Sequence, residues 1–192
     1  MAWEIVNQNQ TDQIISLFHR YGDEDYDQEP VSHTSHLIQC AMLAMHEDAD
    51  TELILAAFLH DIGHLLRHDR KTGSMGGYGA VNHEIVGAEY LHDKGLSIRI
   101  CDLIAHHVDA KRYLVAIDDS YREKLSAASL QTLEWQGGPM NALEIHAFRQ
   151  HPFFEDIIKV RLWDERAKDP YTELLPLSFF QGMLFDFLNR NS

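Results

Sequence analysis

The stretch AAFLHDIGHLL, residues 56–66, places two imidazoles and a carboxylate inside an apolar run. The surrounding residues 50–68 extend that run and predict the central, most apolar helix of the fold. Burying a charged group without a partner costs free energy. We therefore expect His60, Asp61 and His64 to bind something in the interior of the protein.

Helical periodicity continues on both sides of this stretch. The first helix is expected over residues 11–22, with Thr11 as its N-cap and Gly22 as its end. Further helices are expected over residues 32–48, 83–95, 97–117, 122–140, 141–169 with a break at Pro152, and 176–190. An acidic loop (23–32) and a glycine-rich loop (70–82) interrupt them. No alternating strand pattern exceeds a few residues. The sequence predicts an all-α fold with a single domain over residues 1–192.

The composition limits the classes of partner. The 192 residues carry a formal net charge of −14, whereas nucleic acids and anionic membranes attract basic surfaces. An anion site must therefore be built locally, from cations held in a pocket. The only two cysteines, Cys40 and Cys101, indicate a reducing compartment. The first ten residues lack signal-peptide features and no apolar run has membrane-spanning length, so we expect a cytoplasmic protein.

Histidines and aspartates recur at helix-length intervals. The gaps from residue 36 to 60, from 61 to 83 and from 83 to 107 are 24, 22 and 24 residues. Each position lies on a different predicted helix, so antiparallel packing could bring all of them together. This set suits Fe, Mn, Co or Zn. It consists of His36, His60, Asp61, His83 and His107, with Asp164 as a sixth candidate. His106 competes with His107, because adjacent helical residues point in different directions.

At this point the sequence resembles a known family. His36, the His60–Asp61 pair and Asp164 match the signature of HD-domain metalloproteins, most of which are phosphohydrolases. His83 and His107 resemble the two further histidines found in the branch of this superfamily that binds two metal ions. Further stretches resemble the phosphonate-cleaving dioxygenases among the HD-domain diiron oxygenases: HLIQCA (36–41), MGGYG (75–79), HVDAKRYL (107–114), TLEWQGGPM (132–140) and VRLWDER (160–166).

The resemblance implies an HD-type helical bundle that holds two irons as a mixed-valent Fe(II)/Fe(III) pair. It implies that His36, His60, Asp61 and Asp164 hold one iron and that His83 and His107 hold the other. Asp61 then bridges the two ions. The match also selects His107 rather than His106.

Cations and hydroxyls accompany these positions. Lys111 lies one turn beyond His107, and Arg161 lies three residues before Asp164. Two such cations suit a phosphonate, although surface ion pairing is the alternative for each. By the match, Ser129 and Gln136 donate further hydrogen bonds to substrate, while helix capping or packing is the alternative for Ser129.

Three residues are expected to act on the substrate. His64 lies four residues after His60, where many dimetal HD hydrolases have lysine. Its alternative role is to orient a metal ligand. By resemblance, Tyr26 and Glu29 form a gate: substrate displaces the tyrosine, and the glutamate borders the substrate's ammonium. A solvated acidic loop is the alternative for both.

These features favour an organophosphonate dioxygenase using O2. The implied substrates are a 1-hydroxy-2-(trimethylammonio)ethylphosphonate, yielding glycine betaine and phosphate, or the free amine, yielding glycine and phosphate. The acidity around Tyr26, from Asp25, Asp27 and Glu29, favours the trimethylated compound. The rivals are a metal-dependent HD phosphohydrolase acting on a nucleotide and a non-catalytic sensor.

Overall fold

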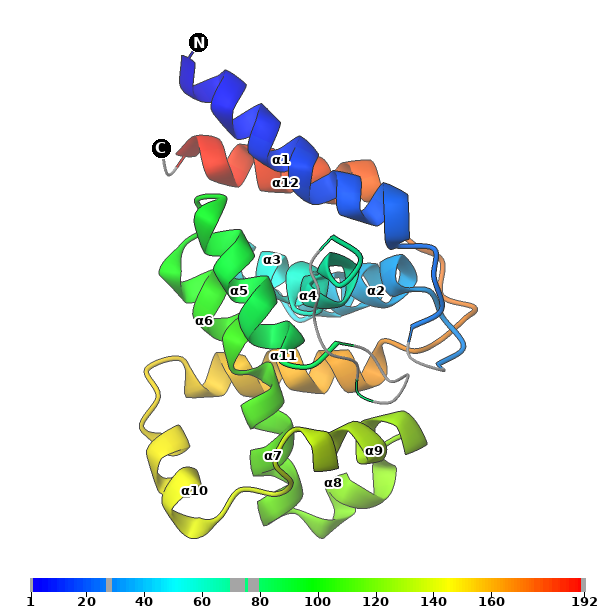
Figure 1. Ribbon diagram of the computed structural model, residues 1–192, viewed down its shortest axis with the longest axis vertical. Coiled ribbons are helices and arrows are strands. Elements are labelled where there is room, and N and C mark those ends of the chain that lie inside the picture. The colour runs from blue at the N-terminus through cyan, green and yellow to red at the C-terminus, as the bar shows by residue number, and fades with distance from the viewer. Residues whose placement is uncertain (1, 27–28, 70–74, 76–79, 191–192) are drawn as a thin grey trace.

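The computed structural model describes residues 2–26, 29–69, 75 and 80–190 (Figure 1). The described residues are mainly helical, and an isolated bridge pairs Asp25 with Ser32. The all-α prediction is therefore confirmed. The helices are α1 (Ala2–Tyr21), α2 (His33–His46), α3 (Thr51–Leu59), α4 (Ile62–Leu66), α5 (His83–Asp93), α6 (Ile98–Ala105), α7 (His107–Ile117), α8 (Asp119–Lys124), α9 (Ala127–Trp135), α10 (Ala142–Arg149), α11 (Phe154–Arg166) and α12 (Leu177–Arg190).

Helix α3 is the centre of the main hydrophobic core. All its residues from Leu53 to Leu59 are buried. It contacts α2, α6, α11 and α12, and α1 pairs with α12 at the end of the molecule where both termini lie (Figure 1). Burying every face of a helix stabilises it through tertiary packing. The core thus surrounds the stretch that carries His60 and Asp61.

Two of the predicted helices are broken at candidate metal ligands. The apolar run 50–68 divides into α3 and α4, because Asp61 leaves helical geometry at φ −105° and ψ 15°. The run 97–117 divides into α6 and α7 at His106, with φ −111° and ψ 5°. Expecting one continuous helix in each run was wrong. Carbonyls at the ends of α3 and α6 accept hydrogen bonds from the neighbouring imidazoles instead of extending the helix.

The N-cap predicted at Thr11 is also wrong. Helix α1 begins at Ala2, and Thr11 is buried in its middle. The polar residues upstream do not interrupt the helix, because they pair along its surface: Gln8 with Asp12, and Gln13 with Asn9. The predicted end is confirmed, since α1 stops at Tyr21, one residue before Gly22.

A smaller hydrophobic cluster joins α7, α8 and α9. It consists of Val115, Tyr121, Leu125 and Leu133. The expected helix over 122–140 is divided here, because Ser126 caps α9 by accepting a hydrogen bond from the Ser129 amide at 3.1 Å. The break expected at Pro152 is confirmed between α10 and α11. The single-domain assignment stays a prediction. None of the described helices is long and apolar enough to cross a membrane.

Candidate metal centre and adjoining pocket

Four buried imidazoles from four different segments converge as two pairs. His36 of α2 and His60, which follows α3, have Nε2 atoms 3.3 Å apart. His83 and His107, the first residues of α5 and α7, have Nε2 atoms 3.2 Å apart. The structure therefore brings His107 into the cluster, while the half-buried His106 pairs with Asp109 at 2.8 Å.

Backbone carbonyls fix the orientation of all four rings. The Nδ1 atoms of His36, His60, His83 and His107 lie 2.9, 2.9, 3.3 and 2.8 Å from carbonyl oxygens. A carbonyl only accepts, so each Nδ1 carries a proton and each Nε2 atom points inward. Nε2 atoms that face each other at these separations repel unless a proton or a metal ion lies between them. This is the arrangement that metal-binding histidines adopt.

Asp61 connects the two imidazole pairs. Its Oδ2 atom lies 3.4 Å from His60 Nε2, and its Oδ1 atom lies 3.1 Å from His83 Nε2 and 3.3 Å from His107 Nε2. Asp164 Oδ1 lies 3.4 Å from His36 Nε2 and completes the first set. We call His36, His60, Asp61, His83, His107 and Asp164 the metal cluster. Its two ligand sets share one carboxylate.

The charges of the metal cluster favour a bound cation. Burial opposes the charge of Asp61, but the adjacent His60 and His83 hold the pKa of its carboxyl well below the usual range. Burial also opposes a charge on His60, but Asp61 raises the pKa of this imidazole to about 10. The Oδ1 atom of Asp61 is buried without a hydrogen bond, despite its two nitrogen neighbours. This nitrogen and carboxylate set therefore suits a metal site for borderline divalent ions.

Gly63, whose role was not predicted from the sequence, allows His83 and His107 to reach Asp61 as the second ligand set. A Cβ atom at this position would lie 2.0 Å from the carbonyl oxygen of His83. Helices α4 and α5 thus approach each other through backbone contact (Figure 1). Only glycine permits this approach, which holds His83 against Asp61.

His64 is oriented differently from the four imidazoles of the metal cluster. Its Nδ1 atom accepts a hydrogen bond from the Ala80 amide at 3.1 Å, so its proton lies on Nε2. That Nε2 atom lies 3.9 Å from Asp61 Oδ1. Burial holds the pKa of His64 well below its usual value, so the ring is neutral. His64 is thus an N–H donor beside the metal cluster rather than a further ligand.

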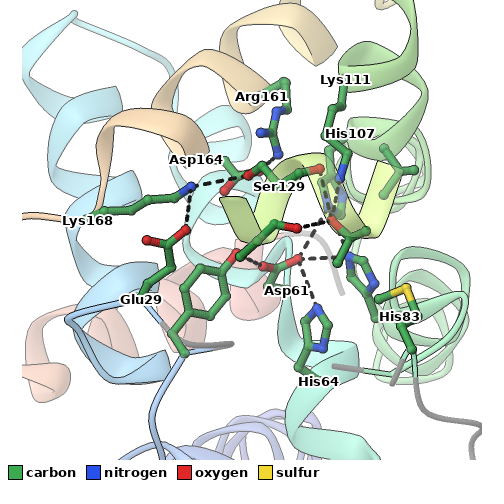
Figure 2. A pocket seen from close by; sticks show the side chains of 15 residues that line it. Glu29, Asp61, His64, His83, His107, Lys111, Ser129, Arg161, Asp164 and Lys168 are labelled. Atoms are coloured by element: carbon green, nitrogen blue, oxygen red, sulfur yellow. Dashed lines mark hydrogen bonds and ion pairs between the residues drawn. The ribbon is translucent and has the colours of Figure 1, made fainter. Parts of the chain in front are cut away.

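A small pocket opens over the metal cluster (Figure 2). Its volume is about 40 Å³, so an organic ligand must displace side chains to enter. Tyr26, Glu29, His64, Lys111, Ser129 and Arg161, all predicted site residues, line it together with Asp61, His83, His107 and Asp164. Gln136 does not line it and lies at the C-cap of α9.

Cations and hydroxyls form one side of the pocket, which we call the cationic wall: Lys111, Arg161, Lys168, Ser129 and Thr132. Lys111 donates to Thr132 Oγ1 at 3.0 Å, and burial lowers the pKa of its ammonium to about 7. Lys168 lies 3.3 Å from Ser129 Oγ. The hydroxyls of Ser129 and Thr132 lie on one face of α9, each paired with one lysine.

Arg161 connects the cationic wall to the metal cluster. Its guanidinium donates to Asp164, to Glu165 and, at 2.8 Å, to the Tyr121 hydroxyl. Sequence reasoning missed Tyr121 and Glu165, together with Lys168 and Thr132. For Glu165 and Lys168, the spacing after Arg161, four and seven residues, could have indicated a shared side of the chain.

Two residues of the predicted gate point inward. The Tyr26 hydroxyl donates to Asp61 Oδ2 at 2.6 Å, and its ring stacks on His36 with centroids 3.9 Å apart. The Glu29 carboxylate lies 3.2 Å from Lys168 Nζ (Figure 2). Asp25 is exposed, so its charge faces water, and Asp27 lies outside the described residues.

Comparisons with known proteins find a family profile and several relatives. The HD domain profile matches residues 34–144. A [1-hydroxy-2-(trimethylamino)ethyl]phosphonate dioxygenase (glycine-betaine-forming) of Leisingera caerulea is 40% identical over 81% of this chain and 78% of its own length. A hydroxymethylphosphonate dioxygenase of Gimesia maris is 38% identical over 81% and 76%. An uncharacterised protein of Acanthamoeba polyphaga mimivirus is 37% identical over 93% and 82%.

Proposed function

The chain belongs to the HD domain family, and from this premise we propose that it is a diiron, O2-dependent dioxygenase that cleaves the carbon–phosphorus bond of a 1-hydroxyalkylphosphonate. The relatives named as phosphonate dioxygenases support the enzyme class. The observation that carries the proposal is the position of Asp61, whose two carboxylate oxygens face two separate pairs of imidazoles.

The proposed reaction balances with O2 as the only oxidant. A substrate R–CH(OH)–PO3²⁻ and O2 give R–COO⁻, HPO4²⁻ and one proton. The carbon–phosphorus and carbon–hydrogen bonds break, the hydroxyl oxygen becomes one carboxylate oxygen, and one new oxygen joins the carbon. In the net balance the second oxygen of O2 accounts for the new phosphorus–oxygen bond, and O2 is fully reduced. When bound, the iron pair supplies oxygen activation and Lewis acidity toward the substrate's oxygens.

The protein contributes orientation, charge and the exclusion of water. The cationic wall lies beside the metal cluster, so it holds the phosphonate there through charge-assisted hydrogen bonds. His64 offers a neutral N–H to an oxygen above Asp61. The Tyr26 hydroxyl donates a hydrogen bond to Asp61 Oδ2, and this side chain moves aside when the substrate enters. Closure by such residues keeps water away from the reacting carbon.

The charges that line the pocket bear on which substituent the substrate carries at its carbinol carbon. The trimethylammonio and free-amine compounds are the substrates expected from the sequence, and one relative is named for hydroxymethylphosphonate. The preference for the trimethylated compound relied on several acids around Tyr26. Asp25 is exposed and Glu29 is paired with Lys168, so neither supports that preference, and Asp27 lies outside the described residues.

The test is coupled measurement of O2 uptake and phosphate release by iron-loaded protein. We expect one phosphate for each O2 consumed and no phosphate without O2. His107→Ala should abolish both, whereas His106→Ala, which alters the adjacent residue outside the metal cluster, should retain both. Phosphate release from a nucleotide in the absence of O2 would instead support the phosphohydrolase alternative.

A further inference from the structure

A second group of metal-ligating side chains lies outside the metal cluster, at the end of α6. One ligand atom from each of Asp102, His106 and His151 lies within 4.8 Å of the other two. Asp102 is on α6, His106 separates α6 from α7, and His151 lies between α10 and α11. The three side chains are 37%, 34% and 17% exposed, so an ion reaches them directly from solvent. We call these three residues the Asp102 triad.

Helix geometry places two members of the Asp102 triad on one side of the chain. The His106 amide donates to the Asp102 carbonyl at 3.1 Å, which closes the last turn of α6. Residues four apart on a helix are neighbours on its surface. Helices use this spacing to present two ligands to one metal ion. Asp102 and His106 therefore offer a carboxylate and an imidazole side by side.

The ring of His106 is oriented by a second carboxylate. Its Nδ1 atom lies 2.8 Å from Asp109 Oδ2, and Arg112 lies 3.4 Å from the other oxygen of that carboxylate. The carboxylate accepts, so Nδ1 carries a proton and the neutral ring presents its lone pair at Nε2. Metal-binding histidines are oriented in this way by carboxylates that do not touch the metal.

His151 approaches the same place from a different part of the chain. Its Nε2 atom lies 3.7 Å from Asp102 Oδ2. In the structure its Nδ1 atom accepts a hydrogen bond from the Phe153 amide at 3.2 Å, so the proton of the neutral ring lies on Nε2, toward Asp102. A metal ion at Nε2 takes the place of that proton. The ring then carries its proton on Nδ1 and gives up one neutral hydrogen bond, a small loss beside a zinc–imidazole bond.

We propose that Asp102, His106 and His151 form a zinc site, with Asp109 orienting His106 and water completing the coordination. A tetrahedral zinc ion holds its ligand atoms about 3.3 Å apart, so the 3.7 Å between His151 and Asp102 needs little adjustment. Two imidazoles and a carboxylate also suit Fe²⁺, but Zn²⁺ binds such a set more tightly. The inference goes beyond the proposed function and does not rest on it.

The expected role of this zinc ion is to hold helices together. The ion joins α6, the break between α6 and α7, and the connection between α10 and α11. That break also positions His107, the residue after His106, in the metal cluster. The Asp102 triad does not line the pocket above the metal cluster, so we expect stabilisation rather than catalysis.

Zinc binding to iron-loaded protein tests the proposal. The protein is dialysed anaerobically against Zn²⁺, and both metals are measured by elemental analysis. We expect one zinc per chain with no loss of iron, and a higher Tm, because an ion that binds only the folded state stabilises it. No zinc uptake, or zinc uptake matched by release of iron, would overturn the proposal.

Variants locate the zinc, whatever fills the metal cluster. Asp109→Asn should weaken zinc binding by about tenfold or more. His151→Ala and Asp102→Asn, which remove ligands, should weaken it further and abolish the zinc-dependent rise in Tm. The matched control is His146→Ala, which removes an exposed histidine from α10 and should bind zinc like the parent. Zinc affinity equal to that of the parent in folded His151→Ala and Asp102→Asn would overturn the proposal.

Discussion

The metal cluster and the cationic wall are adjacent but are held in place by different means. Every imidazole of the metal cluster is held by a backbone carbonyl, from Ala57 and Ile104 within helices and from Ala80 and Ala167 outside them. The wall is held by contacts between side chains, such as Lys168 with Glu29 and Lys111 with Thr132. Backbone anchors fix geometry permanently, whereas pairs of long side chains can exchange partners. The difference is what the proposed function requires: a rigid site for resident ions beside an adaptable site for a transient anion.

Removing the shared ligand should have the largest effect on the metal cluster. Asp61→Ala leaves both ligand sets short of an oxygen, so we expect loss of both irons and of all O2-dependent phosphate release. Metal analysis of purified protein measures this directly. Asp93→Ala, which removes an exposed carboxylate from α5, should keep two irons per chain. Full metal content in Asp61→Ala would show that Asp61 is not the bridge.

Gly63→Ala tests whether backbone contact sets the second ligand set. The new Cβ must push His83 away, which should lower the free energy of unfolding by about 1–3 kcal/mol and release the iron of His83 and His107. Urea unfolding and metal analysis measure the two effects. In α12, Gly182→Ala fills open space, so this control should not destabilise the fold. Retention of two irons in Gly63→Ala would contradict the explanation that close approach of α4 and α5 positions His83.

Substitutions in the cationic wall should change substrate affinity more than metal content. Lys111→Ala should raise KM by about 10- to 100-fold with two irons retained, because it removes one charge-assisted contact. Arg161→Ala should do the same and also loosen one iron, since Arg161 holds Asp164. Steady-state kinetics and metal analysis compare the variants. A KM equal to that of the parent in both variants would show that these cations do not bind the substrate's phosphonate.

An ion-pair network far from both sites should have the smallest effect. Arg99 pairs with Asp50, Glu52 and Asp156 near the surface, so Arg99→Ala should cost about 1 kcal/mol and leave both irons in place.

The stability lost in Arg99→Ala should become smaller as the pH falls. Although burial opposes the shift, Arg99 lowers the folded-state pKa of Asp156 below its unfolded value of about 3.9. The stabilisation is therefore complete above about pH 4 and lost as the pH falls through the folded-state value. Urea unfolding of the parent and variant at pH 7 and pH 3 should show the difference shrinking at pH 3. An unchanged difference would contradict the sign.

Sequence predicted the metal cluster better than the wall, for a physical reason. His36, His83 and His107 each lie within or at the start of a helix, so their spacing reflects how helices pack. The helix breaks at Asp61 and His106 were missed, because apolar periodicity does not reveal where a side chain competes with the helix for a carbonyl.

The wall depends on tertiary approach. Glu29 lies in a loop and Lys168 follows α11, so no local pattern joins them. Gln136 is the converse case: its motif matched, but it lies at the end of α9, outside the lining of the pocket, and its substrate contact stays a prediction. Pairings between residues more than a hundred positions apart become visible only when the helices are assembled.

Two irons at one shared-carboxylate site can be tested directly by anaerobic titration of metal-free protein with Fe(II), followed by partial oxidation and EPR spectroscopy. We expect saturation at two irons per chain and an EPR signal from a spin-coupled Fe(II)/Fe(III) pair. Saturation at one iron, or two irons that give only the signals of isolated ions, would contradict it.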